Sequence, residues 1–464
     1  MNLELQDIAR AISAAPPDGN PVIADYSTDS RTAVPGCLYL ALRGPNYDGH
    51  AFVQAAFDRG AAAAVVEVER GQAKRPAPPE LPAAGQPQLA VPDVQGALEA
   101  LAAWARRRWQ GTVVAITGSA GKTTTKEVAA RLLASEMAVG KTEGNLNNHI
   151  GVPLSILRLP EQAQAAVIEI GMNHAGEIRR LAAIARPTVG VVTNAGFAHA
   201  EFFRSVDEVA LAKRELIEAL PPDGTAVLNA DDERVAAFGR GFGGRVVTFG
   251  FAEDADVRAE AVEYGPQGVR FRVDGTEFES SFVGRHGVMN ILAGLAVARV
   301  FSIPPARLAA AVRSLEPVRM RGERYAWGGA TILDDCYNSN PEAVRAMLDA
   351  LRVMPARRRI AVLGEMLELG DWSEPLHRGI GSHAVQCGID VLVGIRGAAR
   401  QTIDEAVRSG LPASAAVFFD EPEAAGEFLR GLIRPGDAIL FKGSRGTQVE
   451  RALQTLTGAG GGNH

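Results

Sequence analysis

Apolar residues in this chain gather into short runs that alternate with longer segments of helical spacing. Three of the runs are residues 112–118, 165–171 and 188–194. The segments between them repeat apolar residues every three or four positions, and residues 94–109 form such a helix with a basic C-terminal end. Strands that alternate with helices pair in parallel, so this pattern predicts an α/β block around a parallel sheet.

Blocks of similar pattern precede and follow this one. Residues 37–42 and 61–68 indicate two buried strands with a helix between them, and residues 71–88, rich in Pro, Ala and Gly, indicate a linker or long surface loop. Beyond the central block, strand–helix alternation starts again, which predicts a second doubly wound sheet. Its expected strands are residues 330–335, 358–364, 390–395, 415–420 and 438–444.

The stretch from residue 245 to 284 has a different character. It consists of short, alternating, turn-punctuated segments, which predict a small antiparallel extension before a helix at 290–301. The expected fold is therefore α/β with three domains. These are a small α/β domain at 1–92, a central phosphate-loop domain with a parallel sheet at 93–316, and a Rossmann-like doubly wound domain at 317–464, whose tail from residue 458 is expected to be disordered.

Composition narrows the function classes. The net charge is −6, so no basic excess favours nucleic acid as a partner. No apolar run approaches the roughly 18 residues of a spanning helix, and the N-terminus lacks the pattern of a secretory signal. Cys37, Cys336 and Cys387 lie far apart without CxxC spacing, which indicates reduced thiols in a cytoplasmic protein and argues against a zinc site.

The segment AITGSAGKTTTKEV (115–128) carries the clearest chemistry. An apolar strand delivers the chain to Gly118, and a helix is expected to begin near Thr123. Small residues from Gly118 to Gly121 let the backbone approach phosphate oxygens, while Lys122 would reach the terminal phosphates and Thr123 would bind Mg²⁺. The spacing Gly-x-x-Gly-Lys-Thr is shorter than that of GTPase-like loops, but it still predicts phosphate binding.

Polar residues at the ends of other expected strands supply partners for this loop. Glu169 ends one apolar strand and His199 lies just beyond another, so both are expected at the edge where doubly wound sheets bind ligands. A single loop histidine is more often a surface or capping residue, and the placement beside Glu169 favours a role at the phosphates. Asp335 and Asn338 follow the first strand of the third block at the equivalent edge.

Two further segments are ambiguous by chemistry alone. Asn145, Asn147 and Asn148 lie between glycines, and such residues suit turns as well as they suit a recognition loop for a sugar or peptide. Lys442 and Ser444, with Arg445, follow the last expected strand and suggest a weak clamp for a carboxylate.

Taken together, these motifs resemble the ATP-dependent Mur ligases of peptidoglycan synthesis, from about residue 25 to 455. The segment DDCYNSNP (334–341) and the segment VLGEMLELG with the later His377 resemble the branch that acts on a muramoyl tripeptide. The other segments that carry the resemblance are TGSAGKTTTK (117–126), GNLNNHIGVP (144–153), EIGMNHAGEI (169–178), TNAGFAHAE (193–201), LAKRELI (211–217) and KGSRG (442–446).

The resemblance implies a function and a set of partners. An enzyme of this branch uses ATP and two Mg²⁺ ions to join D-alanyl-D-alanine to UDP-N-acetylmuramoyl-tripeptide through an acyl phosphate, as a cytoplasmic monomer that neither binds nucleic acid nor inserts into a membrane. The alternatives are a related Mur or folylpolyglutamate-type ligase that adds a single amino acid, and a phosphate-loop ATPase that is not a ligase.

The resemblance also implies residue roles. Lys213 matches a lysine that is carbamylated and bridges metal ions, although its spacing alone indicates an ordinary helix residue. Arg321 matches an arginine that stabilises the transferring phosphate, with Arg324 as a competitor, and Gly287 departs from the asparagine usual beside His286. The ATP site would comprise Gly118, Ser119, Ala120, Gly121, Lys122, Thr123, Thr124, Asn290 and Asp335; the metal site Thr123, Glu169, His199 and Lys213; and the substrate site Ser30, Asp48, His50, Asn145, Asn147, Asn148, Asn338, Lys442 and Ser444.

Overall fold

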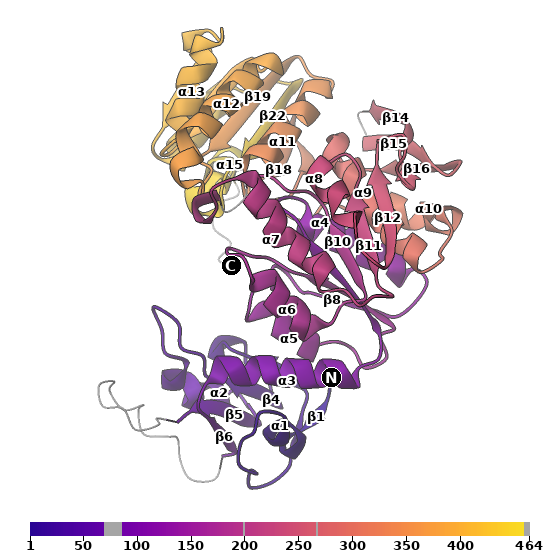
Figure 1. Cartoon of the computed structure of the whole chain (residues 1–464). Helices are drawn as coiled ribbons and strands as arrows, with labels where there is room; N and C mark the ends of the chain where they lie inside the picture. Colours follow the sequence, from indigo (N-terminus) through magenta and orange to yellow (C-terminus); the bar gives the residue numbers. More distant parts are fainter. Residues whose placement is uncertain (69–85, 198–199, 266–267, 459–464) are drawn as a thin grey trace.

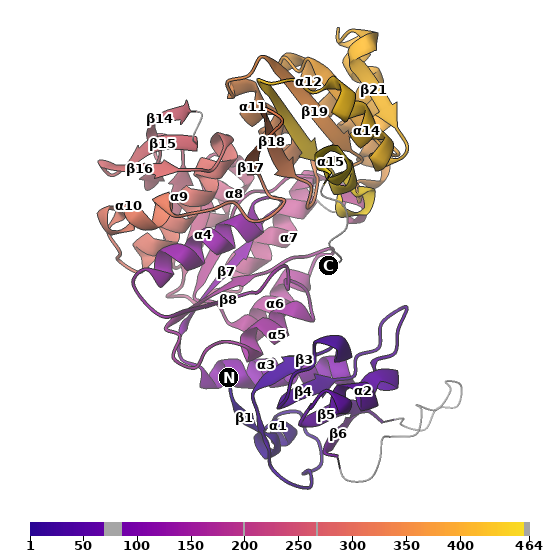
Figure 2. The ribbon, with the colours of Figure 1, turned by 180° about the vertical axis from the view of Figure 1, so that it is seen from behind.

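The computed structural model describes residues 1–68, 86–197, 200–265 and 268–458, and it has three α/β domains in a row (Figures 1 and 2). Most of the predicted linker and nearly all of the predicted tail lie outside the described residues. Among the described residues, no helix combines the length and apolar character that crossing a membrane requires.

The first domain is built on a parallel sheet in the order β3-β4-β5-β6. The predicted strands at 37–42 and 61–68 are present, and Gln88–Val91, at the end of the predicted linker, is a strand that the sequence did not indicate. A short antiparallel pair, β1 and β2, lies beside the sheet. The elements are β1 Leu3–Glu4, α1 Leu5–Ala11, β2 Val22–Ile23, β3 Asp25–Ser27, β4 Cys37–Leu40, α2 Val53–Asp58, β5 Ala63–Glu67 and β6 Gln88–Val91.

Helix α3 (Val94–Arg108) joins the first domain to the second. Asp93 caps its N-terminus, and its apolar face, with Leu98 and Leu101, belongs to one continuous core that includes residues of both domains. At its basic end, Arg106 is buried and donates hydrogen bonds to the carbonyls of Ala185 and Trp109 at 2.7 and 2.6 Å. The predicted helix at 94–109 is thus confirmed, and part of its basic end serves as an internal anchor.

The central domain contains a seven-stranded sheet in the order β13-β12-β11-β10-β7-β9-β8, with every pair parallel. Helices α4 and α9 share a core with one face, and α3, α5 and α6 share a core with the other. The elements are β7 Thr112–Thr117, α4 Lys122–Ala134, β8 Val139–Lys141, α5 Gly151–Leu157, β9 Ala165–Glu169, α6 Glu177–Ala185, β10 Val189–Val192, α7 Val206–Glu218, β11 Thr225–Asn229, α8 Glu233–Ala236, β12 Arg245–Gly250, β13 Val257–Arg258, α9 Gly284–Val300 and α10 Pro305–Arg313.

One strand prediction in this domain is wrong. Residues 245–250 form β12, which pairs in parallel with β11 and extends the main sheet, so they are not part of an antiparallel extension. The alternating pattern arises because β12 lies near the sheet edge, where only the two-residue β13 covers it. The antiparallel extension is limited to β14 (Glu260–Gly265), β15 (Gly268–Val273) and β16 (Thr276–Ser280). The helix expected at 290–301 already begins at Gly284.

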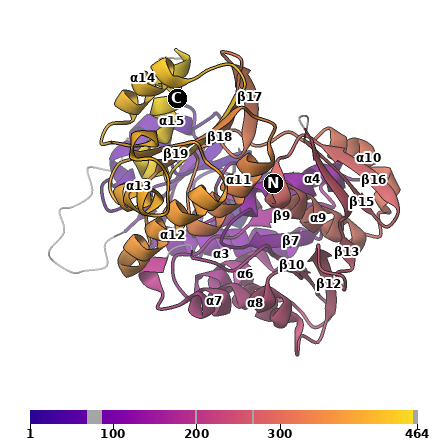
Figure 3. The same ribbon diagram turned by 90° about the horizontal axis from the view of Figure 1, so that it is seen from above.

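The C-terminal domain contains a six-stranded sheet in the order β17-β18-β22-β19-β20-β21. Its five predicted strands are present and parallel. Strand β17 (Glu323–Trp327) adds an antiparallel edge. The sequence did not indicate this strand because it has no apolar run, and two of its five residues are exposed. The other elements are β18 Ala330–Asp335, α11 Pro341–Val353, β19 Arg358–Gly364, α12 Ser373–Gln386, β20 Val391–Ile395, α13 Ala399–Arg408, β21 Ala416–Phe419, α14 Pro422–Leu432, β22 Asp437–Lys442 and α15 Val449–Thr457. Seen from above, this domain lies over one end of the central sheet (Figure 3).

Candidate active site

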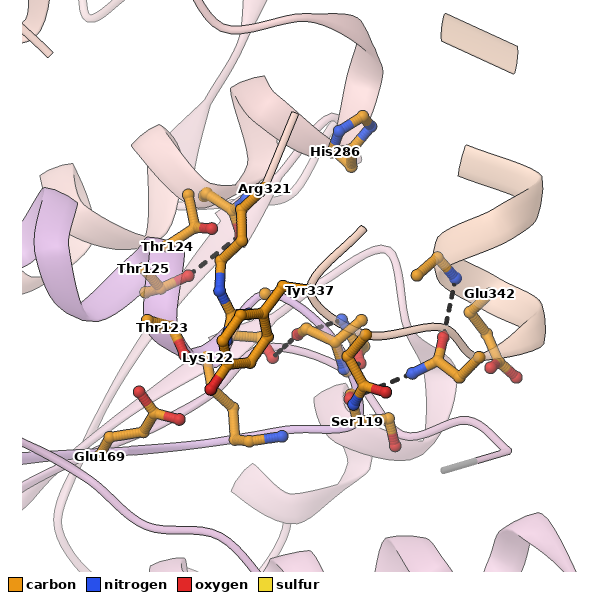
Figure 4. A pocket seen from close by; sticks show the side chains of 18 of the residues that line it. Ser119, Lys122, Thr123, Thr124, Thr125, Glu169, His286, Arg321, Tyr337 and Glu342 are labelled. Carbon is orange, nitrogen blue, oxygen red and sulfur yellow. Dashed lines mark hydrogen bonds between the residues drawn. The ribbon is translucent and has the colours of Figure 1, made fainter. Parts of the chain in front are cut away.

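A cavity of about 650 Å³ lies where the carboxyl ends of the central strands meet the C-terminal domain. Figure 4 shows Lys122, Glu169 and Arg321 around this space. The cavity therefore brings together residues that are far apart in the sequence. The predicted site residues that line it are Ser119, Ala120, Gly121, Lys122, Thr123, Thr124, Asn145, Asn147, Asn148, Glu169, Asn290, Arg321, Asp335, Asn338 and Lys442.

The phosphate loop forms as the sequence predicted, between the end of β7 and the first residue of α4, Lys122. Its glycines are required by close packing. A Cβ at Gly118 would lie 1.9 Å from the Thr193 hydroxyl oxygen, and one at Gly121 would lie 2.6 Å from Asn290 Oδ1. Both glycines also have positive φ, at 153° and 83°. Both glycines of this short motif thus lie where the loop packs too closely against Thr193 and Asn290 to leave room for a side chain.

The residues after β10, for which no individual role was predicted, hold this loop in place. Asn194 Oδ1 accepts the Ala120 N–H at 2.8 Å, and Thr193 Oγ1 donates to the Ala120 carbonyl at 2.7 Å. The Ser119 hydroxyl bonds both the carbonyl and the N–H of Gly196, at 3.0 and 2.9 Å. The motif TNAGFAHAE contains these residues, so that segment was the signal for them.

Positive charge gathers at the cavity. Lys122 Nζ donates to the Gly118 carbonyl at 2.7 Å, which folds the side chain back over the loop. Burial lowers the pKa of Lys122; the Glu169 carboxylate opposes this shift, and the positive charge of Arg321 adds to it. The guanidinium carbon of Arg321 lies 3.9 Å from the centre of the Tyr337 ring, which orients the side chain. An anion placed here would relieve the repulsion between the two cations.

Of the two competing arginines, Arg321 lines the cavity. Arg324 lies on β17 and is not among the lining residues. Partial burial lowers the pKa of the Arg324 guanidinium. The structure thus favours Arg321 for contact with a ligand in the cavity.

Glu169 offers a buried carboxylate oxygen at the end of β9. The residue is 1% exposed, and Asn147 donates to its Oε1 at 2.7 Å. Its Oε2 has no hydrogen-bond partner within the part of the chain that the structure describes. A buried, unpartnered carboxylate oxygen is costly, and a hard cation such as Mg²⁺ satisfies it. Thr123, also buried, lines the same cavity, and its hydroxyl offers a second oxygen of the kind that Mg²⁺ takes.

The three asparagines have different environments. Asn147 supports Glu169, while Asn148 Oδ1 accepts the N–H groups of Ile150 and Gly151 at 3.1 and 2.9 Å at the start of α5. Asn145 is exposed and lines the cavity. The turn interpretation therefore holds for Asn148, and the role of Asn145 in recognising a substrate stays a prediction.

Lys213 is a residue whose environment the sequence did not reveal. It lies on α7 with 2% exposure, and burial lowers its pKa well below the usual range, helped by the nearby positive charge of Lys122. It is not one of the cavity-lining residues. His199, which was also predicted to bind a metal ion, lies outside the described residues.

Two residues at the start of α11 connect the C-terminal domain to the phosphate loop, and sequence reasoning missed both. Asn340 caps α11 and donates from Nδ2 to the Ser119 carbonyl at 3.3 Å. Glu342 Oε1 accepts the Phe197 N–H at 2.8 Å, while its Oε2 is buried without a partner among the described residues. Burial raises the pKa of Glu342. Asn340 before Pro341 is a helix-start signal that indicated the cap, but no signal indicated the contacts between domains.

The predicted carboxylate clamp is largely internal. Lys442 Nζ donates to Asp335 Oδ2 at 2.6 Å and to the Asn338 carbonyl at 2.9 Å, so its charge already has a partner. Ser444 is buried, accepts the Leu367 N–H at 3.0 Å, and is not among the cavity-lining residues. The structure brings Lys442, Asp335 and Asn338 together and leaves Ser444 behind them.

The three predicted residues of the first domain do not line the cavity. Asp48 accepts the His50 backbone N–H and lies 2.5 Å from His50 Nδ1, while His50 Nε2 accepts the Glu67 N–H at 2.9 Å. Both ring nitrogens of His50 thus have partners within the domain. Ser30 is buried at the start of a short 3₁₀ turn.

Comparison with known proteins agrees with this geometry. Family models match residues 22–106 (Mur ligase family, catalytic domain), 116–298 (Mur ligase middle domain) and 319–445 (Mur ligase, glutamate ligase domain). Two relatives named UDP-N-acetylmuramoyl-tripeptide–D-alanyl-D-alanine ligase are similar along nearly their whole length. That of Synechocystis is 35% identical, with 94% of this chain and 92% of the relative covered, and that of Bacillus subtilis is 32% identical, with 97% of each covered.

Two solved structures are also similar to this chain over nearly its whole length. A crystal structure of MurF from Acinetobacter baumannii has a TM-score of 0.86 and 29% identity over 99% of each chain. The MurF ligase of Thermotoga maritima, solved in complex with ADP, has a TM-score of 0.81 and 28% identity over 94% of this chain and 97% of that one. On the strength of these matches over almost its whole length, this chain belongs to the Mur ligase family.

Proposed function

We propose that this chain is an ATP-dependent ligase that joins D-alanyl-D-alanine to UDP-N-acetylmuramoyl-tripeptide. The observation that carries the proposal is the cavity in which the phosphate loop, a buried unpartnered Glu169 oxygen and Arg321 face residues of the C-terminal domain. The curated relatives that are 32–35% identical over nearly the whole chain have this activity in their names.

The reaction follows from the chemistry of a carboxylate, which is a poor acyl donor. Transfer of the γ-phosphoryl group of ATP to the peptide carboxylate gives an acyl phosphate and ADP. The amine of D-alanyl-D-alanine then attacks the acyl carbon, forms an amide and expels phosphate. Lys122 and Arg321 stabilise the negative charge that the transferring phosphoryl group and the attacking carboxylate bring together.

Mg²⁺ fits the residues that are present. Thr123 and Glu169 would hold one ion through a hydroxyl and a carboxylate oxygen, and His199 is proposed for a second ion. A bound Mg²⁺ would neutralise phosphate charge. Asn147 keeps the Glu169 carboxylate oriented by bonding its other oxygen.

We also propose that Lys213 is carbamylated. The reaction with CO₂ requires a neutral amine, and burial beside the positive Lys122 favours that form. The product is an anion that would balance Lys122. After incubation with ¹³C-bicarbonate, NMR should show a carbamate carbon that is lost in Lys213→Ala. An unchanged spectrum in the variant would contradict the assignment.

The other untested predictions belong to this proposal. The first domain (1–92) would bind the uridine end of the substrate through Ser30, Asp48 and His50, and the boundaries 92/93 and 316/317 would separate the three domains. Asn290 and Asp335 would contact the nucleoside of ATP, and Asn145 and Asn338 would lie toward the peptide. A cytoplasmic monomer remains the expected form.

The test is ADP release measured with every pairing of nucleotide substrate and amine. ADP should form only when Mg²⁺, UDP-N-acetylmuramoyl-tripeptide and D-alanyl-D-alanine are all present, and both diaminopimelate- and lysine-containing tripeptides should be offered. Turnover with a free amino acid in place of the dipeptide would identify a different ligase of the family. Turnover without any carboxylate substrate would identify an ATPase, and either result would overturn the proposal.

A further inference from the structure

Three side chains of metal-binding type converge on the C-terminal domain, away from the cavity. His383 and Cys387 lie one turn apart at the end of α12, and Asp349 lies on α11, which packs beside α12 (Figure 3). Neither the cavity nor any predicted site includes these residues. The distances are 3.0 Å from His383 Nε2 to Asp349 Oδ1, 3.4 Å from Cys387 Sγ to the same oxygen, and 3.5 Å from Cys387 Sγ to His383 Nε2. The three ligand atoms form a compact triangle.

This triangle has nearly the dimensions of a zinc coordination sphere. Bonds of about 2.3 Å to sulfur and about 2.0–2.2 Å to nitrogen or oxygen, at tetrahedral angles, place neighbouring ligand atoms about 3.3–3.6 Å apart. The two pairs that involve sulfur therefore already have this spacing, and the His383 Nε2–Asp349 Oδ1 pair, at 3.0 Å, needs to open by only a few tenths of an ångström. An alternative arrangement, a Cys–His–Asp relay for nucleophilic attack, would place the thiol and the carboxylate on different ring nitrogens. Here both contact Nε2, so a relay is excluded by the geometry.

The way these three residues are brought together explains why the sequence did not indicate a zinc site. The absence of CxxC argued against zinc, but positions i and i+4 lie on one helix face, and the Cys387 N–H still bonds the His383 carbonyl at 2.9 Å. Helix α12 thus supplies two ligands without any paired cysteines. The third comes from α11, 34 residues away from His383, and only the packing of the two helices reveals it.

Burial gives the site a closed and an open side. Cys387 is 2% exposed, the His383 side chain 18% and the Asp349 side chain 53%. An ion would approach from the Asp349 side and keep that direction free for a water molecule. Three protein ligands with one open position are common for zinc, and a thiolate with an imidazole disfavours Mg²⁺ and Ca²⁺.

We propose that Asp349, His383 and Cys387 bind one borderline divalent transition-metal ion, with Zn²⁺ as the best match and water as the fourth ligand. On binding, a metal–sulfur bond replaces the S–H bond of Cys387, and the proton leaves to solvent. Burial raises the pKa of Cys387 to about 12, so the thiol keeps its proton until the ion displaces it. The ion would cross-link α11 to α12 and stabilise the domain that carries Asn340 and Glu342.

The test uses the full-length chain in millimolar Mg²⁺, which occupies oxygen-rich sites but not thiolate sites. Titration with Co²⁺ alone should produce thiolate-to-metal charge transfer in the near ultraviolet, and Zn²⁺ should abolish that absorption at one equivalent. Cys387→Ser should remove the absorption, and Asp349→Asn should weaken Zn²⁺ binding at least about 10-fold, the minimum expected when even a supporting partner is lost. Zn²⁺ should also raise the unfolding temperature of the unsubstituted chain.

Cys37→Ser and Cys336→Ser are the matched controls, because each removes a buried thiol and leaves the triangle intact. Both should keep the cobalt absorption. The proposal is wrong if Cys387→Ser binds Zn²⁺ as tightly as the unsubstituted chain, or if cobalt absorption is absent or depends on Cys336. Because each readout is independent of ATP turnover, failure here leaves the proposed ligase activity untouched.

Discussion

The central domain builds its wall of the cavity around a backbone loop at the ends of parallel strands, whereas the groups placed on the opposite wall by the C-terminal domain are side chains. On the central wall, the loop from Gly118 to Lys122 is fixed by glycine geometry and by bonds from the chain after β10. On the C-terminal wall, Arg321 is oriented by stacking on Tyr337, and Glu342 reaches the Phe197 N–H. The first wall exists within a single domain, and the second depends on two domains meeting.

This difference separates two parts of the chemistry. Holding phosphate needs many oriented N–H groups, which only rigid backbone provides. Placing charge on a transferring group needs cations that approach after substrates bind, which side chains on a second domain can do. Changes to the central wall should therefore abolish activity, and changes to the C-terminal wall should reduce it in steps.

The largest effect is expected for Lys122→Ala. It removes the cation nearest the transferred phosphate, so kcat should fall at least about 10²–10³-fold, the usual loss for one such contact. The phosphate loop should remain folded, because the glycines and Asn194 hold it without the lysine amine. ADP release measures the first expectation, and thermal unfolding within a few degrees of the unsubstituted chain measures the second. A variant with near-normal kcat would show that the central wall works through backbone alone.

A matched pair of variants tests the C-terminal wall. Arg321→Ala should lower kcat by about 10²-fold, because its guanidinium lines the cavity, whereas Arg324→Ala should change kcat less than about threefold, because it does not. Both residues carry one positive charge and lie three positions apart. Comparing the two variants therefore distinguishes the effect of direct contact with substrate from the effect of positive charge anywhere in this part of the domain. Equal losses in the two variants would mean that net positive charge matters more than position.

A smaller effect is expected where the two walls touch. Glu342→Ala leaves the Phe197 N–H without its partner, which costs about 1–3 kcal/mol and should lower kcat/KM about 5- to 150-fold. Glu342→Gln keeps an oxygen that accepts this N–H and should retain most of the activity. The two variants are compared in the ADP-release assay. If Gln is as damaging as Ala, the negative charge toward Lys213, and not the hydrogen bond, is what the site uses.

The two walls also differ in how far the sequence predicted them. The central wall follows from local signals: an apolar strand, small residues and a helix start place Gly118 to Thr123, and a strand end places Glu169. On the C-terminal wall, a strand end placed Asp335 in the same way, but Arg321 came from family resemblance, and Asn340 and Glu342 were missed because contacts between domains leave no periodic trace. Sheet pairing is equally invisible in the sequence. Strand β12, near one edge of its sheet, has the alternating pattern of an exposed strand, and the edge strand β17 has the pattern of a loop.

The smallest effect on activity is expected at a carboxyl at the base of the C-terminal wall, where a substitution should change mainly the stability of the fold. Burial raises the pKa of Asp334 from 3.8 to about 6, so at pH 7 the folded domain holds a carboxylate that would be more stable in water. The sign follows from proton binding. Between pH 4 and 6 the folded form binds more protons than the unfolded form, so this group costs stability as pH rises.

Asp334→Asn removes that cost and keeps an oxygen that can accept the Cys336 N–H, now at 3.2 Å. The variant should therefore be more stable than the unsubstituted chain by about 1–3 kcal/mol at pH 7, and the difference should shrink toward zero at pH 4. Unfolding temperatures of both chains across this range measure it. A variant that is less stable at pH 7 would mean that the Asp334 charge is paired in the folded domain. In that case the C-terminal wall would contain a fixed anion beside its cations, as the central wall does with Glu169 and Lys122.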